Sequence, residues 1–231
     1  MPRLPSISIR LSRLRQVLRV AACAAPLALS ACNSVNFGGG DIGQIYRLAK
    51  AEWSGKDRDV TMAQAAASPY ASMGIRLGDG PQSMILLAGE SGTERMWTSA
   101  DHITLATRNG RIVRTAGLKR NLSGYQTVRD TDNGNGMRTI LWFADFADLG
   151  LYSVPILCRD RNAGPETITI LGKTIHTRRV NESCASQNSR LDWSFHNTYW
   201  RDPESDLTWR SIQHVHPGTE AIETEILRPP G

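Results

Sequence analysis

Residues 103–115 read ITLATRNGRIVRT, and this stretch decides the fold class of the chain. Two short runs rich in β-branched and apolar residues, 103–107 and 111–115, flank the dipeptide Asn109-Gly110. An Asn-Gly pair between two such runs favours a two-residue turn, because both residues adopt a positive φ at little cost. The stretch therefore predicts a β-hairpin.

Strand-like runs continue on both sides of this hairpin, from about residue 71 to residue 227. Turn residues separate them, and Pro155 marks its own run as an edge strand or a bulge. No linker or internal repeat interrupts the series. We therefore predict a mostly β protein with a single antiparallel barrel-like or sandwich-like domain, long enough to bury a core. The expected strands cover 84–88, 95–99, 103–107, 111–115, 126–129, 137–143, 151–158, 167–171, 174–180, 193–199, 207–215 and 221–227.

One or two short helices are expected before the first strand. Asp41 has the character of an N-cap, and apolar residues follow it at helical spacing over 42–53. A second helix is predicted over 61–67, with Thr61 as its cap and Pro69 as its stop.

The first 31 residues have the anatomy of a bacterial lipoprotein signal. Five arginines and no acidic residue precede an apolar run over 20–31, which is too short to span a bilayer. Leu29-Ser30-Ala31 then places small residues before Cys32, as at a site where a thiol is acylated. A plain secretory signal and a mitochondrial-type presequence are the alternatives. We predict a signal peptide over 1–31, a lipidated Cys32 with a flexible, glycine-rich tether over 32–40, and a β domain over 41–231.

The leader also accounts for the positive charge of the chain. Subtracting its five arginines from 27 basic residues leaves 22, which equals the number of acidic residues. No positive excess remains to favour nucleic acid as a partner. Membrane lipid is the expected partner through the acylated Cys32, because two or more acyl chains hold a protein stably. Asn33, in place of an aspartate, favours the periplasmic face of the outer membrane.

Two cysteines remain once Cys23 is lost with the leader and Cys32 is acylated. Cys158 and Cys184 are an even pair in an oxidising compartment, and we predict a disulfide between them. The alternative is two unpaired buried thiols. A catalytic thiol has no supporting Cys-x-x-Cys or local Cys/His pattern.

Motifs for catalysis and cofactor binding are absent from the sequence. There is no Gly-x-Ser-x-Gly, Walker loop, dinucleotide fingerprint or His-Glu-x-x-His. His214 and His216 have a spacing that can ligate a metal, but no third ligand is evident. We therefore predict no catalytic residue, metal or cofactor. Paired carboxylates of a glycoside hydrolase stay open as an alternative, with loop residues as the candidates: Asp101, Asp145, Asp148 and Asp202.

Several stretches together resemble the YjbF family of lipoproteins, also called group 4 capsule polysaccharide lipoprotein GfcB. They are WTSAD at 97–101, GRIVRTAGL at 110–118, NTYWRD at 197–202 and WRSIQ at 209–213, followed by a proline at 217. The resemblance covers nearly the whole chain after the leader. It implies a mostly β, barrel-like fold, a role in exopolysaccharide or capsule production and export, and no established enzymatic activity or catalytic set.

We therefore expect a non-enzymatic outer-membrane lipoprotein that binds exopolysaccharide or polysaccharide export proteins. A lipid-anchored polysaccharide hydrolase or lyase and a purely structural assembly factor are the alternatives. Arg114 is expected either to hold an acidic sugar by a bidentate contact or to form an internal ion pair with a carboxylate such as Asp101. Tryptophans are included because sugar rings stack on aromatic faces, although most tryptophans in a β domain belong to its core. The candidate binding residues are Trp97, Asp101, Arg111, Arg114, Asn197, Trp200 and Trp209.

Overall fold

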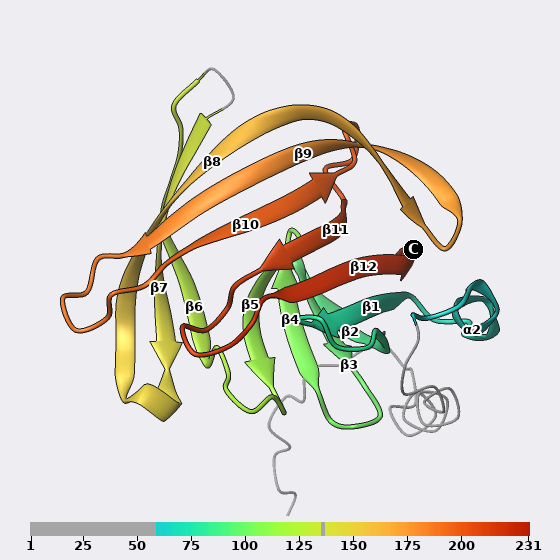
Figure 1. The fold of residues 1–231 in the computed structure, drawn as a ribbon, viewed down its shortest axis with the longest axis horizontal. Helices are drawn as coiled ribbons and strands as arrows, with labels where there is room; N and C mark the ends of the chain where they lie inside the picture. Colours follow the sequence, from blue (N-terminus) through green and yellow to red (C-terminus); the bar gives the residue numbers. More distant parts are fainter. Residues whose placement is uncertain (1–58, 135–136) are drawn as a thin grey trace, which may run out of the picture. The chain divides into compact units, whose positions relative to one another are not determined.

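The computed structural model describes residues 59–134 and 137–231 as one antiparallel sheet of twelve strands, preceded by a short helix (Figure 1). The elements are α2 (Met62–Ala67), β1 (Ser72–Leu77), β2 (Ser83–Ser91), β3 (Glu94–Thr98), β4 (Thr104–Arg108), β5 (Arg111–Ala116), β6 (Gly124–Asp132), β7 (Met137–Phe146), the 3-10 turn η1 (Ala147–Leu149), β8 (Leu151–Ile170), β9 (Lys173–Ser186), β10 (Ser194–Arg201), β11 (Thr208–Gln213) and β12 (Ile222–Arg228). The mostly β prediction is confirmed. The expected helix over 42–53, the tether and Cys32 lie outside the described residues.

The sheet curls into a nearly closed barrel. Its strand order is β5-β4-β3-β2-β1-β12-β11-β10-β9-β8-β7-β6, so the first and last strands of the sheet, β5 and β6, are consecutive in the chain. The segment that connects them folds back on β5, where the Thr115 N–H donates to the Leu122 carbonyl at 2.9 Å and the Leu122 N–H donates to the Thr115 Oγ1 at 2.9 Å, two residues before β6 begins. No ladder joins β5 to β6 beyond this contact within the described residues.

The helix and the first hairpin follow their sequence signals. Thr61 caps α2 in a capping box with Gln64, as the cap prediction required. Asn109 and Gly110 both have positive φ, 50° and 78°, in the turn between β4 and β5. A Cβ on Gly110 would lie 2.1 Å from Thr208 Oγ1, so the tip of this hairpin packs directly against the start of β11.

Two predictions about strand β8 are wrong. The runs 151–158 and 167–171 belong to one strand of 20 residues, because a bulge at Gly164, with φ 101°, absorbs the irregular middle without ending the pairing with β9. Pro155 is not on an edge strand, since β8 pairs with β7 and β9. Pro155 precedes the first β8–β9 pair, Ile156 with Ser186, and its carbonyl accepts from the Gln187 N–H at 2.8 Å. Its missing N–H therefore faces a place where β9 has already ended.

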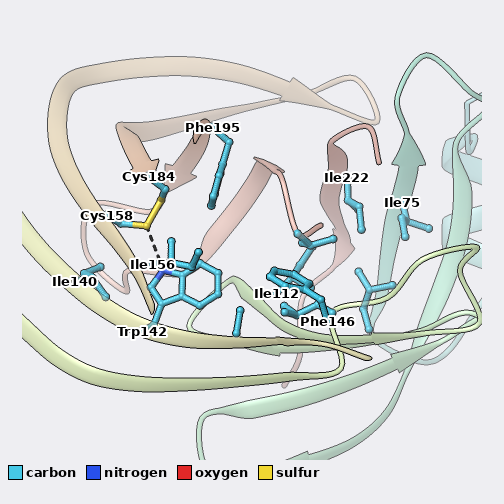
Figure 2. Packing of buried hydrophobic residues seen from close by; sticks show 14 of the residues in the cluster. Ile75, Ile112, Ile140, Trp142, Phe146, Ile156, Cys158, Cys184, Phe195 and Ile222 are labelled. Carbon is cyan, nitrogen blue, oxygen red and sulfur yellow. Dashed lines mark hydrogen bonds between the residues drawn. A yellow bond between two sulfur atoms is a disulfide. The ribbon is translucent and has the colours of Figure 1, made fainter. Parts of the chain in front are cut away.

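The core fills one part of the barrel with apolar side chains from nearly every strand (Figure 2). Phe146, Ile156 and Leu105 are wholly buried there, and the indole N–H of Trp142 donates to Cys158 Sγ at 3.1 Å. Cys158 and Cys184 are directly opposite each other on β8 and β9, with their Cα atoms 4.1 Å apart, and a disulfide joins them.

A second apolar cluster lies on the outer face. The far half of the β8–β9 hairpin curves back over β10, β11 and β12 (Figure 1), and Ile168 and Ile170 pack there against Trp200. The hairpin thereby buries an outward-facing tryptophan that would otherwise be open to solvent.

One buried ion pair ties the edge strand β5 to the opposite wall. Both terminal nitrogens of the Arg111 guanidinium donate to the Glu182 carboxylate on β9. The Arg111 side chain is 11% exposed and that of Glu182 is 0% exposed. Gln213 on β11 adds two bonds across the interior, accepting from the Ile112 N–H at 3.0 Å and donating to the Gly110 carbonyl at 2.8 Å.

Substituting Arg111→Met should lower the free energy of unfolding by about 3 to 5 kcal/mol, because it leaves the Glu182 charge buried without its partner. Urea denaturation of the purified protein measures this. The matched control is Arg114→Met on the same strand, whose side chain is 58% exposed and pairs with Glu94 at 3.5 Å. That exposed pair should contribute about 0 to 1 kcal/mol. Equal losses in the two variants would mean that the Arg111 pair does not tie the sheet together.

Candidate functional site

The inner wall of the barrel changes from apolar to polar between two adjacent rows of cross-strand neighbours. Strands β7, β8, β9 and β10 each contribute one residue to a row, and residues that pair in register share a face. The apolar row consists of Ile140, Cys158, Cys184 and Phe195. The polar row, two residues further along each strand, consists of Arg138, Asp160, Glu182 and Asn197.

Glu182 is the centre of the polar row. Besides the two bonds from Arg111, its carboxylate accepts from Asn197 Nδ2 at 2.7 Å and from the Tyr199 hydroxyl at 3.3 Å. Burial alone would raise the pKa of Glu182, but the charge and hydrogen bonds of Arg111 outweigh it and hold this pKa below its usual range. Glu182 is therefore an ionised, fully bonded carboxylate.

The pKa of Asp160 is shifted in the opposite direction to that of Glu182. It lies directly across from Glu182 on the neighbouring strand and is 5% exposed. Burial, and next the nearby charge of Glu182, raise the pKa of Asp160 to about 6, although Arg111, Arg138 and Arg201 oppose the shift. Its Oδ1 atom is buried and has no hydrogen-bond partner among the described residues.

Two cavities open at this polar end. The larger, of about 330 Å³, lies between strands β1, β3, β4 and β12 and the turn before β11, with Trp97, Thr107 and Thr208 in its lining. The smaller, of about 120 Å³, lies between the unpaired parts of β5 and β6, with Arg111 and Tyr125 on its two sides. Asn109 and Asp206 line both cavities, so the cavities adjoin at the tip of the β4–β5 turn.

The structure brings three of the seven candidate binding residues together here. Trp97, buried and bonded through its indole N–H to Thr107 Oγ1 at 3.0 Å, lines the larger cavity. Arg111 lines the smaller cavity, and Asn197 belongs to the polar row.

The other four candidates lie elsewhere. Asp101 is exposed in the β3–β4 turn, and Arg114 pairs with Glu94 instead of the expected Asp101. Trp200 and Trp209 belong to the outer cluster under the β8–β9 hairpin. Their indole N–H groups donate to carboxylates, that of Trp200 to Glu166 at 2.9 Å and that of Trp209 to Asp202 at 3.4 Å.

Sequence reasoning missed Asp160, Glu182 and Arg201. A signal for Asp160 was present, because it continues the alternating series Val154, Ile156, Cys158 whose members face inward. An acidic residue in phase with buried apolar residues indicates a polar group in the interior. Glu182 stands in the same relation to Cys184.

The structure gives the other polar candidates structural roles. His214 Nδ1 lies 2.9 Å from the His196 carbonyl, and the fully buried His216 places Nε2 3.0 Å from Asp148. Asp145 accepts from the Ser153 N–H, and Asp202 accepts from the backbone of its own turn. Within the described ranges the one group of close potential metal ligands is Cys158, Glu182 and Cys184, whose two sulfurs are bonded to each other. Nor does any helix in the described part of the chain have the length and apolar character to cross a membrane.

The Asp160 environment makes stability depend on pH. The folded protein keeps a proton on this carboxyl up to about pH 6, whereas the unfolded chain releases it near pH 3.8, so stability should fall as pH rises between these values. Asp160→Asn removes this cost. We expect it to raise the free energy of unfolding by about 3 kcal/mol at pH 7.5 and by little at pH 4, as measured by urea denaturation at both pH values. A gain that is the same at both would contradict the assignment.

The sequence and the fold both match known proteins. The chain is 30% identical over 186 residues to the protein named "Uncharacterized lipoprotein GfcB" of Escherichia coli K12, covering 75% of this chain and 84% of that one. It is 23% identical over 169 residues to "Uncharacterized lipoprotein YjbF" of the same organism, covering 69% of this chain and 76% of that one. The crystal structure of the hypothetical lipoprotein YmcC from E. coli K12 shares the fold, with a TM-score of 0.62 and 23% identity, over 84% of this chain and 99% of that one.

A protein-family model also matches most of the chain. Residues 45–227 match the family described as "Group 4 capsule polysaccharide lipoprotein gfcB, YjbF". This range includes all the described strands and leaves out only Arg228, the last residue of β12. The chain therefore belongs to the YjbF family of group 4 capsule polysaccharide lipoproteins.

Proposed function

We propose that this protein is a lipid-anchored, non-catalytic accessory protein of capsule or exopolysaccharide production and export. It is held on the periplasmic face of the outer membrane by acyl chains on Cys32, and its barrel binds the polysaccharide or a component of the export machinery. The observation that carries the proposal is the polar end of the barrel interior, with two adjoining cavities, in a chain of this capsule-related family.

The chemistry of the polar end supports binding rather than turnover. Glu182 accepts hydrogen bonds from Arg111, Asn197 and Tyr199 and is 0% exposed, so neither a substrate nor a water molecule reaches it. A retaining or an inverting glycosidase needs two carboxyl groups that reach the scissile bond. Asp160 alone does not supply that pair.

A polysaccharide hydrolase is nevertheless the second candidate, because one observation favours it. Asp160 and Glu182 are adjacent carboxyl groups whose pKa values are moved in opposite directions, which is the pattern of an acid and a base in many active sites. The test of the proposed function must therefore include a measurement of turnover.

Incubating the purified lipidated protein with the exopolysaccharide of its own organism separates these functions. We expect the polysaccharide to co-purify with the protein, or the protein to co-purify with an export component, and we expect no new reducing ends or unsaturated products. New chain ends that disappear in an Asp160→Asn variant would replace the proposed function with the hydrolase. Loss of the gene without any change in surface or secreted polysaccharide would contradict both.

Anchoring is tested separately. Cys32→Ala should move the protein from the membrane fraction to the soluble periplasmic fraction, because the acyl chains are the proposed hold on the bilayer. Fractionation followed by immunoblotting measures the distribution, and Cys23→Ala is the matched control that should stay with the outer membrane. Continued sedimentation of the Cys32→Ala variant with the outer membrane would show that another contact anchors it.

A further inference from the structure

The smaller cavity, between β5 and β6, is lined by a buried polar residue whose hydrogen bonds the protein does not complete. Arg201, 9% exposed, lines this cavity, and its Nε is without a partner among the described residues. Thr208, 8% exposed, lines the adjoining cavity with an unpartnered Oγ1. Asp160 Oδ1 is the third such atom. A buried donor or acceptor that lacks a partner destabilises the fold, and two of these three residues line adjoining cavities, which indicates groups arranged for a ligand.

Asp160 is a neighbour of the smaller cavity, although it is not one of the residues that line it. It is the cross-strand neighbour of Arg138, which lines that cavity, and the three arginines whose charges act on it, Arg111, Arg138 and Arg201, all belong to the lining. The unpartnered acceptor of Asp160 therefore lies next to the cavity that Arg201 lines with its unpartnered donor.

The charges of this region are balanced before any ligand arrives. Arg111 forms an ion pair with Glu182, and Arg138 forms one with Asp130. Asp206 pairs with both Arg178 and Arg201. Arg108, on the rim, pairs with Glu94 at 2.8 Å. Each of the four arginines that line the smaller cavity therefore has an acidic partner: Arg108 has Glu94, Arg111 has Glu182, Arg138 has Asp130 and Arg201 has Asp206.

Because each lining arginine is already paired with a carboxylate, an anionic ligand would have to displace one of these partners. A carboxylate entering the cavity would meet Asp160 and Asp206 without a spare cation to receive it. Vicinal hydroxyl groups fit better, because a hydroxyl donates to a carboxylate oxygen and accepts from a guanidinium N–H.

We propose that the polar end of the barrel binds an uncharged sugar residue of the polysaccharide, which enters between β5 and β6 and places its hydroxyl groups on Asp160 and Arg201. This inference rests on the proposed function and adds the chemical class of the ligand. The sugar completes the hydrogen bonds that the folded protein leaves open. The rim residues Arg138 and Asp206, 41% and 54% exposed, keep the cavity accessible from solvent.

Oligosaccharides from the organism's own polymer test this inference. Mild acid hydrolysis gives fragments that anion exchange separates into an uncharged and a charged fraction, and each fraction is titrated into the lipidated protein in detergent by calorimetry. We expect the uncharged fraction to bind. We expect Asp160→Ala and Arg201→Gln each to weaken that binding about tenfold, since each removes a hydrogen bond to a charged group.

The controls are Asp79→Ala and Arg190→Gln, which make the same changes at exposed positions outside both cavities and should leave binding unchanged. Binding of the charged fraction alone would overturn the uncharged-sugar inference while the proposed function stands. Binding of the uncharged fraction that survives both substitutions would overturn the site. Absence of binding by either fraction, with secretion of the polymer still dependent on the gene, would also overturn the inference and would leave the function resting on a protein partner. Thermal unfolding of each variant confirms that it is folded.

Discussion

The ion pair between Arg111 and Glu182 is the constraint on which the rest of the barrel depends. A sheet whose edge strands are not joined along their length leaves a gap, and β5 has no ladder partner on that side. The guanidinium of Arg111 spans the interior to β9 instead, while Gln213 holds the backbone of β5 from β11. The edge is thus fastened through the lumen by side chains, and the gap beside β6 stays open as a cavity.

The same pair explains why the interior is divided. Ionic groups in a barrel are tolerated only where each finds partners, so Asn197, Tyr199 and Gln213 gather around Glu182, and the apolar residues fill the other part of the lumen. Asp160 does not fit this pattern. It lies beside Glu182 at a cost in stability, with one oxygen unpartnered, which is the kind of exception that functional sites show.

The sequence predicted the parts of this structure that depend on local pattern. Strand alternation, the Asn109-Gly110 turn and the Thr61 cap were sufficient for a mostly β fold with a short helix ahead of it. Contacts between residues far apart in the chain could not be predicted from the sequence. That Arg111 reaches a residue 71 positions away, and that Arg114 pairs with Glu94, follow from how the sheet curls. Trp200 was expected among the glycan-binding residues, but the β8–β9 hairpin covers it. The length of that hairpin could not be predicted, because the bulge at Gly164 interrupts the strand pattern of β8 in the sequence.

Amide hydrogen exchange at Ile112 tests most directly whether side chains fasten the edge strand through the lumen. Its N–H donates to Gln213 Oε1 in the buried interior, although β5 is an edge of the sheet. If that fastening holds, this amide should exchange as slowly as the amides of the central strands, with an opening free energy close to that of global unfolding. Exchange at the rate of a frayed edge would contradict the account, because β5 would then be free of the opposite wall and the polar end of the barrel would not be a built site.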